Sequence, residues 1–203
     1  MSRKTHWEDV YTRKAAEEVS WFQAETRLSL ELLQAAGMEP QSRVIDVGGG
    51  ASRLVDGLLN RGVQHVSVLD LSASALQQAQ ARLGTLAAQV SWIEGDITQV
   101  DLPEASYDLW HDRAVFHFLT ELEQRAAYVA QLQRVLKAGG HVIIATFAPD
   151  GPEGCSGLPV QRYSAAALQS EIGYPLLDTR EESHLTPGGA TQHFIYCLFR
   201  KPA

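Results

Sequence analysis

Apolar residues group along the chain into short β-branched runs and longer helical stretches that follow one another in turn. Five runs are predicted to be strands, at residues 43–47, 65–69, 90–93, 107–111 and 141–147. Helices are predicted between them, at residues 52–61, 72–83 and 121–136. Strands that alternate with helices form a parallel sheet with helices on both faces.

The N-terminal region and the segment after the fifth strand depart from this rhythm. Residues 5–37 are predicted to be helical, with Gly37 as the C-cap. Residues 148–163 contain three prolines and three glycines and are predicted to form a long loop. A loop at that position follows a strand end, so it is expected to act as an active-site loop.

The C-terminal region predicts a short helix at residues 164–172 followed by a β-hairpin. Two extended segments, 176–184 and 192–200, flank the turn Pro187-Gly188-Gly189. The hairpin adds an antiparallel strand to the parallel sheet. We therefore expect an α/β fold built on a seven-stranded mixed sheet.

Composition and charge are those of a single globular domain covering residues 1–203. Hydrophobic residues make up 45% and charged residues 20%, a balance that excludes disordered and fibrous classes. The formal net charge of -7 disfavours binding to nucleic-acid phosphates. The two cysteines, Cys155 and Cys197, have neither metal-ligand nor disulfide-framework spacing. With no apolar signal segment or long apolar run, we expect a cytoplasmic protein, monomeric or homodimeric, without metal, membrane or nucleic-acid partners.

A glycine-rich turn follows the first predicted strand. Gly48, Gly49 and Gly50 lie where ligands bind in open α/β sheets, beyond the carboxyl ends of the strands. Asp70 ends the second strand, roughly 20 residues further on, the spacing of a carboxylate that accepts ribose hydroxyls. Together these features favour a nucleoside site over a tight turn without a ligand.

The same region disfavours a dinucleotide cofactor. Arg53 stands where the last glycine of G-x-G-x-x-G would fall. Asp46 lies inside the strand just before the turn, where a carboxylate would repel a pyrophosphate. A carboxylate suits a cationic ligand instead, such as the amino group and sulfonium of S-adenosylmethionine (SAM).

These residues resemble the motifs of the class I SAM-dependent methyltransferases, over nearly the whole chain. The segment VIDVGGGAS is similar to the first motif, although Ser52 replaces its third glycine. The resemblance implies a Rossmann-like domain with SAM as cofactor and S-adenosylhomocysteine as product. It also implies that Asp46 and Gly48, Gly49 and Gly50 lie against the methionyl and ribose parts of SAM.

Two further segments resemble the adenosine-binding motifs of that family. VLDLS is similar to the second motif, which would place Asp70 on the ribose hydroxyls and Leu71 against the adenine. EGDITQVDLP is similar to the third, with Asp96 accepting a hydrogen bond from the adenine amino group and Ile97 on the ring. For Asp96 a plain turn position remains the alternative.

The segment YDLWHDRAVFHFL resembles the fourth-strand motif of the family, which lies beside the transferred methyl group. The resemblance makes Asp112, Arg113 and His117 the candidate catalytic residues, with Asp112 also near the cofactor. His117 is a candidate general base because an unperturbed histidine titrates near neutrality, and a structural hydrogen bond is its alternative role. Candidate acceptor-binding residues are His111, Arg113, Arg162 and Tyr163.

The N-terminal segment HWEDVYTRKAAEEVSWFQ resembles the leader of some small bacterial methyltransferases and of related lysine methyltransferases. In these proteins a W-x-x-x-Y segment folds over the SAM site. The candidates for that contact are Trp7, Tyr11 and Trp21, since aromatic faces attract cations. Their alternative role is packing against the sheet. Residues 1–37 would then form a helical cap.

The sequence therefore predicts methyl transfer from SAM to a small-molecule nucleophile by in-line displacement. No inserted domain is present to recognise a large acceptor. The N-terminal resemblance leaves protein lysine methylation as an alternative, and a non-catalytic SAM-binding module is another.

Asp70→Ala is expected to weaken SAM binding by about tenfold or more while leaving the fold intact, because charge-assisted hydrogen bonds to the ribose are lost. Gly48→Val is expected to abolish binding sterically. Calorimetric titration with S-adenosylhomocysteine measures both effects. Unchanged affinity in a folded Asp70→Ala protein would remove Asp70 from the site.

Overall fold

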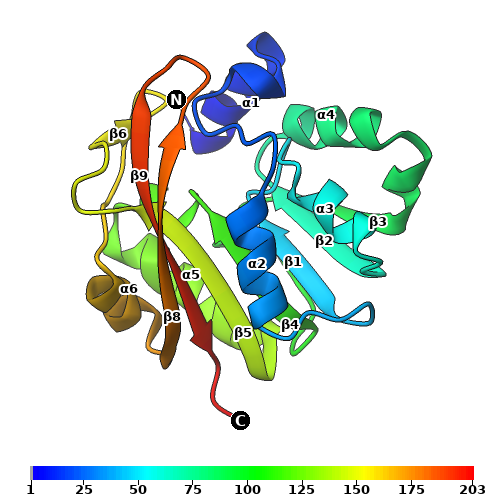
Figure 1. Cartoon of the computed structure of the whole chain (residues 1–203), viewed down its shortest axis with the longest axis vertical. Coiled ribbons are helices and arrows are strands. Elements are labelled where there is room, and N and C mark those ends of the chain that lie inside the picture. The colour runs from blue at the N-terminus through cyan, green and yellow to red at the C-terminus, as the bar shows by residue number, and fades with distance from the viewer. Residues whose placement is uncertain (1) are drawn as a thin grey trace.

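A seven-stranded mixed sheet forms the centre of the molecule in the computed structural model, which describes residues 2–203 (Figure 1). The strand order is β3-β2-β1-β4-β5-β9-β8. The strands of this sheet are β1 (Arg43–Val47), β2 (His65–Asp70), β3 (Val90–Glu94), β4 (Tyr107–Arg113), β5 (Leu136–Phe147), β8 (Leu176–Leu185) and β9 (Thr191–Arg200).

The first five strands are parallel, and β9 runs antiparallel to both β5 and β8. The predicted Rossmann-like mixed sheet is therefore confirmed. The register places Asp46 of β1 between Val68 of β2 and His111 of β4. The carboxyl ends of β1, β2 and β4 consequently meet at one edge of the sheet, where the predicted site residues gather.

Helices cover both faces of the sheet. On one face lie α2 (Arg27–Ala35), α3 (Leu54–Asn60) and α4 (Ala73–Leu83), and on the other lie α5 (Leu122–Val135) and α6 (Ala165–Ile172). Figure 1 shows α2 in front of the sheet and α5 behind it. Side chains alternate between the two faces along each strand.

This alternation is visible in the two hydrophobic cores. Val44 and Ile143 pack in the core beneath α2 and α3, whereas their neighbours Ile45 and Ile144 pack in the core beneath α5 and α6. All four side chains are fully buried.

The N-terminal region was predicted to be one continuous helical segment, but the structure divides it. It contains α1 (Arg3–Arg13), a single 3₁₀ turn η1 (Ala16–Glu18) and α2, and an irregular segment at residues 19–26 separates η1 from α2. The break follows from local hydrogen bonding, because the Glu18 carboxylate accepts a hydrogen bond from the Ala15 backbone N–H at 2.8 Å. That contact starts a new turn instead of extending α1.

Two other segments are more regular than predicted. Strand β5 begins at Leu136 rather than at residue 141, because Leu136 pairs with Tyr107 before the glycine turn. The loop at residues 148–163 contains a small hairpin of β6 (Gly154–Cys155) and β7 (Leu158–Pro159). The remaining short turns are η2 (Gly84–Gln89) and η3 (Phe116–Phe118).

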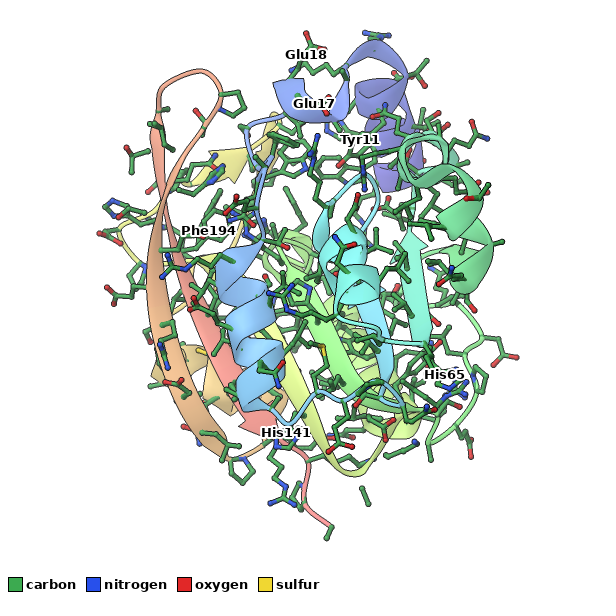
Figure 2. The ribbon with its side chains drawn as sticks, turned by 45° about the vertical axis from the view of Figure 1, so that its right-hand side comes forward. Tyr11, Glu17, Glu18, His65, His141 and Phe194 are labelled. Carbon is green, nitrogen blue, oxygen red and sulfur yellow. The ribbon has the colours of Figure 1, made fainter. Side chains whose placement is uncertain are left out.

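Helix α1 lies beyond the carboxyl edge of the parallel strands. Figure 2 shows Tyr11 at the end of the molecule opposite His65, which begins β2, and His141 of β5. Glu17 and Glu18 lie above Tyr11 in the same view. Within residues 2–203, no helix is both long enough and apolar enough to cross a lipid bilayer.

Phe147→Ala is expected to lower the free energy of unfolding by about 3–5 kcal/mol, because it leaves a cavity in the core. Phe147 is fully buried, and its ring centroid lies 4.8 Å from that of Phe194. Urea unfolding measures the effect. Leu177→Ala is the control, since Leu177 is 53% exposed and its loss should change stability by less than about 0.5 kcal/mol.

Candidate functional site

Two adjoining cavities lie at the carboxyl edge of the parallel strands. The first has about 740 Å³ of empty space that is partly open to solvent, and the second about 530 Å³. Four residues line both cavities and so mark their junction: Tyr11, Trp21, Gly48 and Arg113. The first cavity extends over the ends of β2 and β3, and the second lies between the glycine turn and the N-terminal end of α2.

The glycine turn is fixed by its own backbone. The N–H groups of Gly48 and Gly49 both donate to the Leu69 carbonyl, at 2.7 and 3.2 Å. Gly48 has φ +69°, and a Cβ there would collide with Val115. Gly48→Val would therefore strain the protein even without a ligand. Because the two N–H groups are already paired, this turn does not offer them to a pyrophosphate.

Gly50, predicted to contact the cofactor, lines neither cavity. Its φ is +34°, and a Cβ there would come within 2.6 Å of Asp70 Oδ2. Gly50 therefore leaves space for the Asp70 carboxylate. Gly49 does line the second cavity, as predicted for a residue near the ligand.

Asp70 lines the first cavity but is only 8% exposed. Its Oδ1 accepts a hydrogen bond from the Ser72 N–H at 2.9 Å. Burial raises the pKa of Asp70 to about 7, and the nearby carboxylates of Asp46 and Glu8 add to this effect. The carboxylate therefore changes charge near neutral pH.

The far end of the first cavity is lined by Leu71, Asp96 and Ile97, the three residues predicted to surround an adenine. Asp96 Oδ1 accepts hydrogen bonds from the N–H and hydroxyl of Thr98, at 2.9 and 2.7 Å. Its Oδ2 forms an ion pair with Arg3 at 3.0 Å. Arg3 lines the same cavity and was not predicted from the sequence.

Helix α1 is anchored beside this end of the cavity by Glu8. Its carboxylate accepts hydrogen bonds from the Ser72 hydroxyl at 2.8 Å and from the Ser74 hydroxyl and N–H at the start of α4. Hydrogen bonding from Ser74 lowers the pKa of Glu8. An anionic group at a helix N-terminus is stabilised by the helix dipole. Glu8 was also missed by the sequence analysis, because nothing in its local pattern marks a contact with α4.

The second cavity contains a buried chain of polar groups. Asp46 Oδ1 lies 2.7 Å from His111 Nδ1, and His111 Nε2 lies 2.9 Å from the Ser29 hydroxyl. A Cβ on Gly49 would lie 2.5 Å from Asp46 Oδ2, so the second carboxylate oxygen faces the glycine turn. Thr26 lines the same cavity, is 6% exposed, and has a buried hydroxyl without a hydrogen-bond partner among the described residues.

Arg113 is the cation at the junction of the two cavities, and its donors are engaged. Its guanidinium donates to the Tyr196 hydroxyl at 2.7 Å and to the Trp21 carbonyl at 3.0 Å, and it pairs with Glu182 at 3.3 Å. It also lies 4.1 Å from the centroid of the Phe194 ring. These contacts tie the segment at residues 19–26 to β4, β8 and β9.

The predicted aromatic residues of the N-terminal region do line the first cavity. The Trp21 indole N–H donates to the Tyr11 hydroxyl at 3.0 Å. The ring of Trp7 meets Trp21 and Phe118 edge-on, with centroid separations of 5.5 and 5.0 Å. Phe118 and Cys155 complete this wall and were not predicted as site residues.

Asp112 and His117, two of the candidate catalytic residues, are buried and line neither cavity. Asp112 accepts hydrogen bonds from the Tyr128 hydroxyl at 2.6 Å and the Val115 N–H at 2.9 Å, and burial raises its pKa to about 6. His117 accepts from the Phe147 N–H at 3.3 Å, and burial lowers its pKa to about 3. His117 is therefore a neutral core residue at physiological pH.

Arg162 and Tyr163, predicted to bind the acceptor, also line neither cavity. Tyr163 is 2% exposed and packs against Phe116, with ring centroids 5.5 Å apart. Arg162 forms an ion pair with Glu153 at 3.0 Å, within the loop itself. That loop reaches the first cavity through Cys155 instead.

Known proteins match this chain at the level of a domain family, of individual relatives and of the fold. A family model described as a methyltransferase domain matches residues 44–140. An eEF1A lysine and N-terminal methyltransferase of Bos taurus is 26% identical over 149 residues, which are 70% of this chain and 21% of that protein. A malonyl-[acyl-carrier protein] O-methyltransferase of Paenibacillus sp. (strain JDR-2) is 27% identical over 132 residues, 63% of this chain and 46% of that protein.

The chain thus spans between a fifth and a half of the length of these curated relatives. Among solved structures, a 1,6-didemethyltoxoflavin-N1-methyltransferase of Burkholderia thailandensis, with bound 1,6-didemethyltoxoflavin and S-adenosylhomocysteine, has the same fold. Its TM-score is 0.70 at 20% identity, covering 98% of this chain and 84% of that one.

Binding of S-adenosylhomocysteine is expected to strengthen as pH rises through about 7, and to level off above it. In the expected complex, ribose hydroxyls donate to the ionised form of Asp70, whose pKa is about 7 in the free protein, so affinity should fall by up to about tenfold per pH unit below that value. Calorimetry between pH 5.5 and 8.5 measures this. In Asp70→Asn, which cannot ionise, the slope should disappear; an unchanged slope would assign the titration to another group.

Proposed function

We propose that this chain, which belongs to the class I SAM-dependent methyltransferases, transfers the methyl group of SAM to a small-molecule nucleophile by in-line displacement. The observation that carries this proposal is the arrangement of three carboxylates around the two cavities. Asp70 and Asp96 line the first, and Asp46 lines the second. This spacing suits a ligand with a nucleoside at one end and an amino group at the other.

We assign the adenosine half of SAM to the first cavity. Asp70 accepts hydrogen bonds from the ribose hydroxyls, and Asp96 accepts one from the adenine amino group beside Arg3. Leu71 and Ile97 supply apolar contacts to the ring. The low solvent exposure of the Asp70 side chain supports this role, because a carboxylate shielded from water makes stronger hydrogen bonds.

We assign the methionyl half to the second cavity. Asp46 Oδ2, which faces the glycine turn, accepts from the amino group. The His111 and Ser29 side chains fix Asp46 in orientation through its other oxygen. The unpartnered Thr26 hydroxyl is placed to donate to the carboxylate. Thr26 ends the segment at residues 19–26 and Ser29 lies in the first turn of α2, so the N-terminal region contributes directly to this proposed cofactor site.

The chemical step then requires little from the protein. SAM supplies an activated methyl group on its sulfonium, and the chain orients the acceptor in line with it and excludes water. Tyr11 and Trp21 lie at the junction where the sulfonium would sit, with Trp7 beside them in the first cavity, and aromatic ring faces stabilise a cation. Arg113 positions Trp21 through the backbone carbonyl and so acts as a positioning residue.

A small acceptor is favoured by the limited space that SAM would leave. Residues 1–37 form the cap and contribute α1 and the segment at 19–26, while the loop at residues 148–163 adds Cys155 from another side. We propose that both belong to one domain covering residues 1–203. Protein lysine methylation is the second candidate, and the 26% identity to the eEF1A methyltransferase of Bos taurus favours it.

Calorimetric titration of the purified protein with S-adenosylhomocysteine tests the cofactor site, and NAD serves as the parallel control. We expect micromolar or tighter binding of the former and none of the latter. Asp70→Ala should lose most of the affinity, while Leu177→Ala on the exposed face of β8 should keep it. Binding to NAD, or to neither compound, would contradict the proposal. Methylation of eEF1A lysine in preference to small nucleophiles would favour the second candidate.

A further inference from the structure

We propose that the methyl acceptor is a small apolar thiol that reacts as its thiolate, bound between Trp7, Phe118 and Cys155. This inference rests on the proposed methyl transfer and names the substrate class for that reaction. Three features carry it: an apolar wall, the absence of a suitable base among the described lining residues, and the sign of the local charge.

We take the acceptor compartment to be the part of the first cavity that is not assigned to the adenosine half of SAM. Its walls are Trp7, Trp21, Ala114, Val115, Phe118 and Cys155. The aromatic rings meet edge-on, so apolar surface faces the interior from several directions. A compartment of this kind favours an acceptor with an apolar body, because its burial removes hydrocarbon surface from water.

Three titratable side chains face this compartment: Tyr11, Arg113 and Cys155. Arg113 is a permanent cation whose guanidinium is already engaged. Burial raises the pKa of both Tyr11 and Cys155, so both stay protonated at neutral pH. Within residues 2–203, therefore, none of the groups facing the compartment is ready to take a proton from an acceptor.

The other ionisable groups nearby either lie outside this compartment or are held by other partners. Asp70 and Asp96 lie at the adenosine end of the cavity. Glu182 pairs with Arg113, and His184 Nε2 lies 2.8 Å from the Ser20 carbonyl; neither lines the cavity. His117 lies beneath Phe118 in the core and is neutral. An acceptor must consequently lose its proton before it binds.

The charge balance of the reaction favours an anionic acceptor in this compartment. A thiolate and a sulfonium combine to give two neutral products, so a water-poor site does not oppose the step. An amine would instead leave a cation next to Arg113, and no carboxylate is among the side chains that face this compartment, since Asp70 and Asp96 lie at the adenosine end. An alkyl thiol ionises at about pH 8.5, whereas a phenol ionises at about pH 10, so the thiol supplies far more anion near neutrality.

The proposed step is balanced without a further reactant. The thiol releases its proton to solvent, and a lone pair of the thiolate sulfur forms a bond to the methyl carbon. The bond from that carbon to the sulfonium breaks, and its electron pair stays on the sulfur of S-adenosylhomocysteine. The products are a neutral methyl thioether and S-adenosylhomocysteine.

The test compares three acceptors with one carbon body: benzyl mercaptan, benzylamine and benzyl alcohol, each at saturating SAM. Product formation is followed by mass spectrometry against enzyme-free blanks. We expect kcat/KM for the thiol to exceed that for the amine by about a hundredfold or more at pH 7.5, since a thiolate is the stronger nucleophile toward the sulfonium and its reaction leaves no new cation beside Arg113. Equal or greater turnover of benzylamine would overturn the proposal, as would failure to methylate the thiol by a protein that binds S-adenosylhomocysteine.

A second measurement, the pH–rate profile with two different thiols, identifies the group whose ionisation controls the rate. Thiophenol is more acidic than benzyl mercaptan, so the inflection of its pH–rate profile should lie at lower pH if the acceptor's own thiol is the titrating group. An inflection at the same pH for both thiols would reveal a base on the protein and overturn the proposal. Failure to bind S-adenosylhomocysteine would instead reject the proposed function itself, which separates the two failures.

A matched pair of variants tests the local charge. Phe118→Glu places a carboxylate in the compartment, and Phe118→Gln places a neutral group of the same size there. The carboxylate should repel the thiolate and lower kcat/KM for benzyl mercaptan about tenfold below that of the glutamine variant, with equal affinity for S-adenosylhomocysteine in both. Equal thiol turnover in the two variants would show that the acceptor is not an anion at this position.

Discussion

The buried guanidinium of Arg113 is the contact on which the arrangement of the site depends. It joins the end of β4 to Glu182 of β8 and Tyr196 of β9, and it fixes the Trp21 carbonyl of the N-terminal segment. A buried cation is costly unless its donors are satisfied, and here they are. The segment at residues 19–26 has no helix or strand of its own, so its position depends on such contacts, to which the Trp21 indole adds a hydrogen bond to Tyr11. The wall shared by the two cavities is built on that segment.

Strand alternation then decides which side chains reach the cavities. In β4, His111 and Arg113 share one face of the sheet, and His111 lies beside Asp46 of β1. Asp112 points to the opposite face and meets Tyr128 of α5. A step of one residue along a strand reverses the direction of the side chain. The motif at the end of β4 therefore divides between two tasks: His111 and Arg113 line the cavities, and Asp112 holds the turn that carries Val115 and Phe116.

The elements of the fold were predictable because their periodicities are strong. The residues that line the cavities near the glycine turn were also partly predictable, since Asp70, Asp96 and Gly48 lie at or just after strand ends. The sequence could not predict which way each side chain points or which residues on distant elements contact one another. His117 and Tyr163 have the polar groups of site residues, but their backbones direct them into the core. Arg3, Glu8 and Phe118 carry no local pattern that marks them, because their partners lie on distant elements.

The position of α1 has a consequence for the order of events. This helix contacts Asp96 at the proposed adenosine end of the site through Arg3 and the start of α4 through Glu8, and the partly exposed Arg3–Asp96 ion pair is weakened by dissolved salt. In the proposed complex the nucleoside lies against that ion pair, whereas the acceptor compartment is lined mainly by apolar rings that salt does not loosen. Nucleoside exchange should therefore respond to ionic strength while the methyl-transfer step itself does not, so that the two halves of the catalytic cycle are governed by different physical forces.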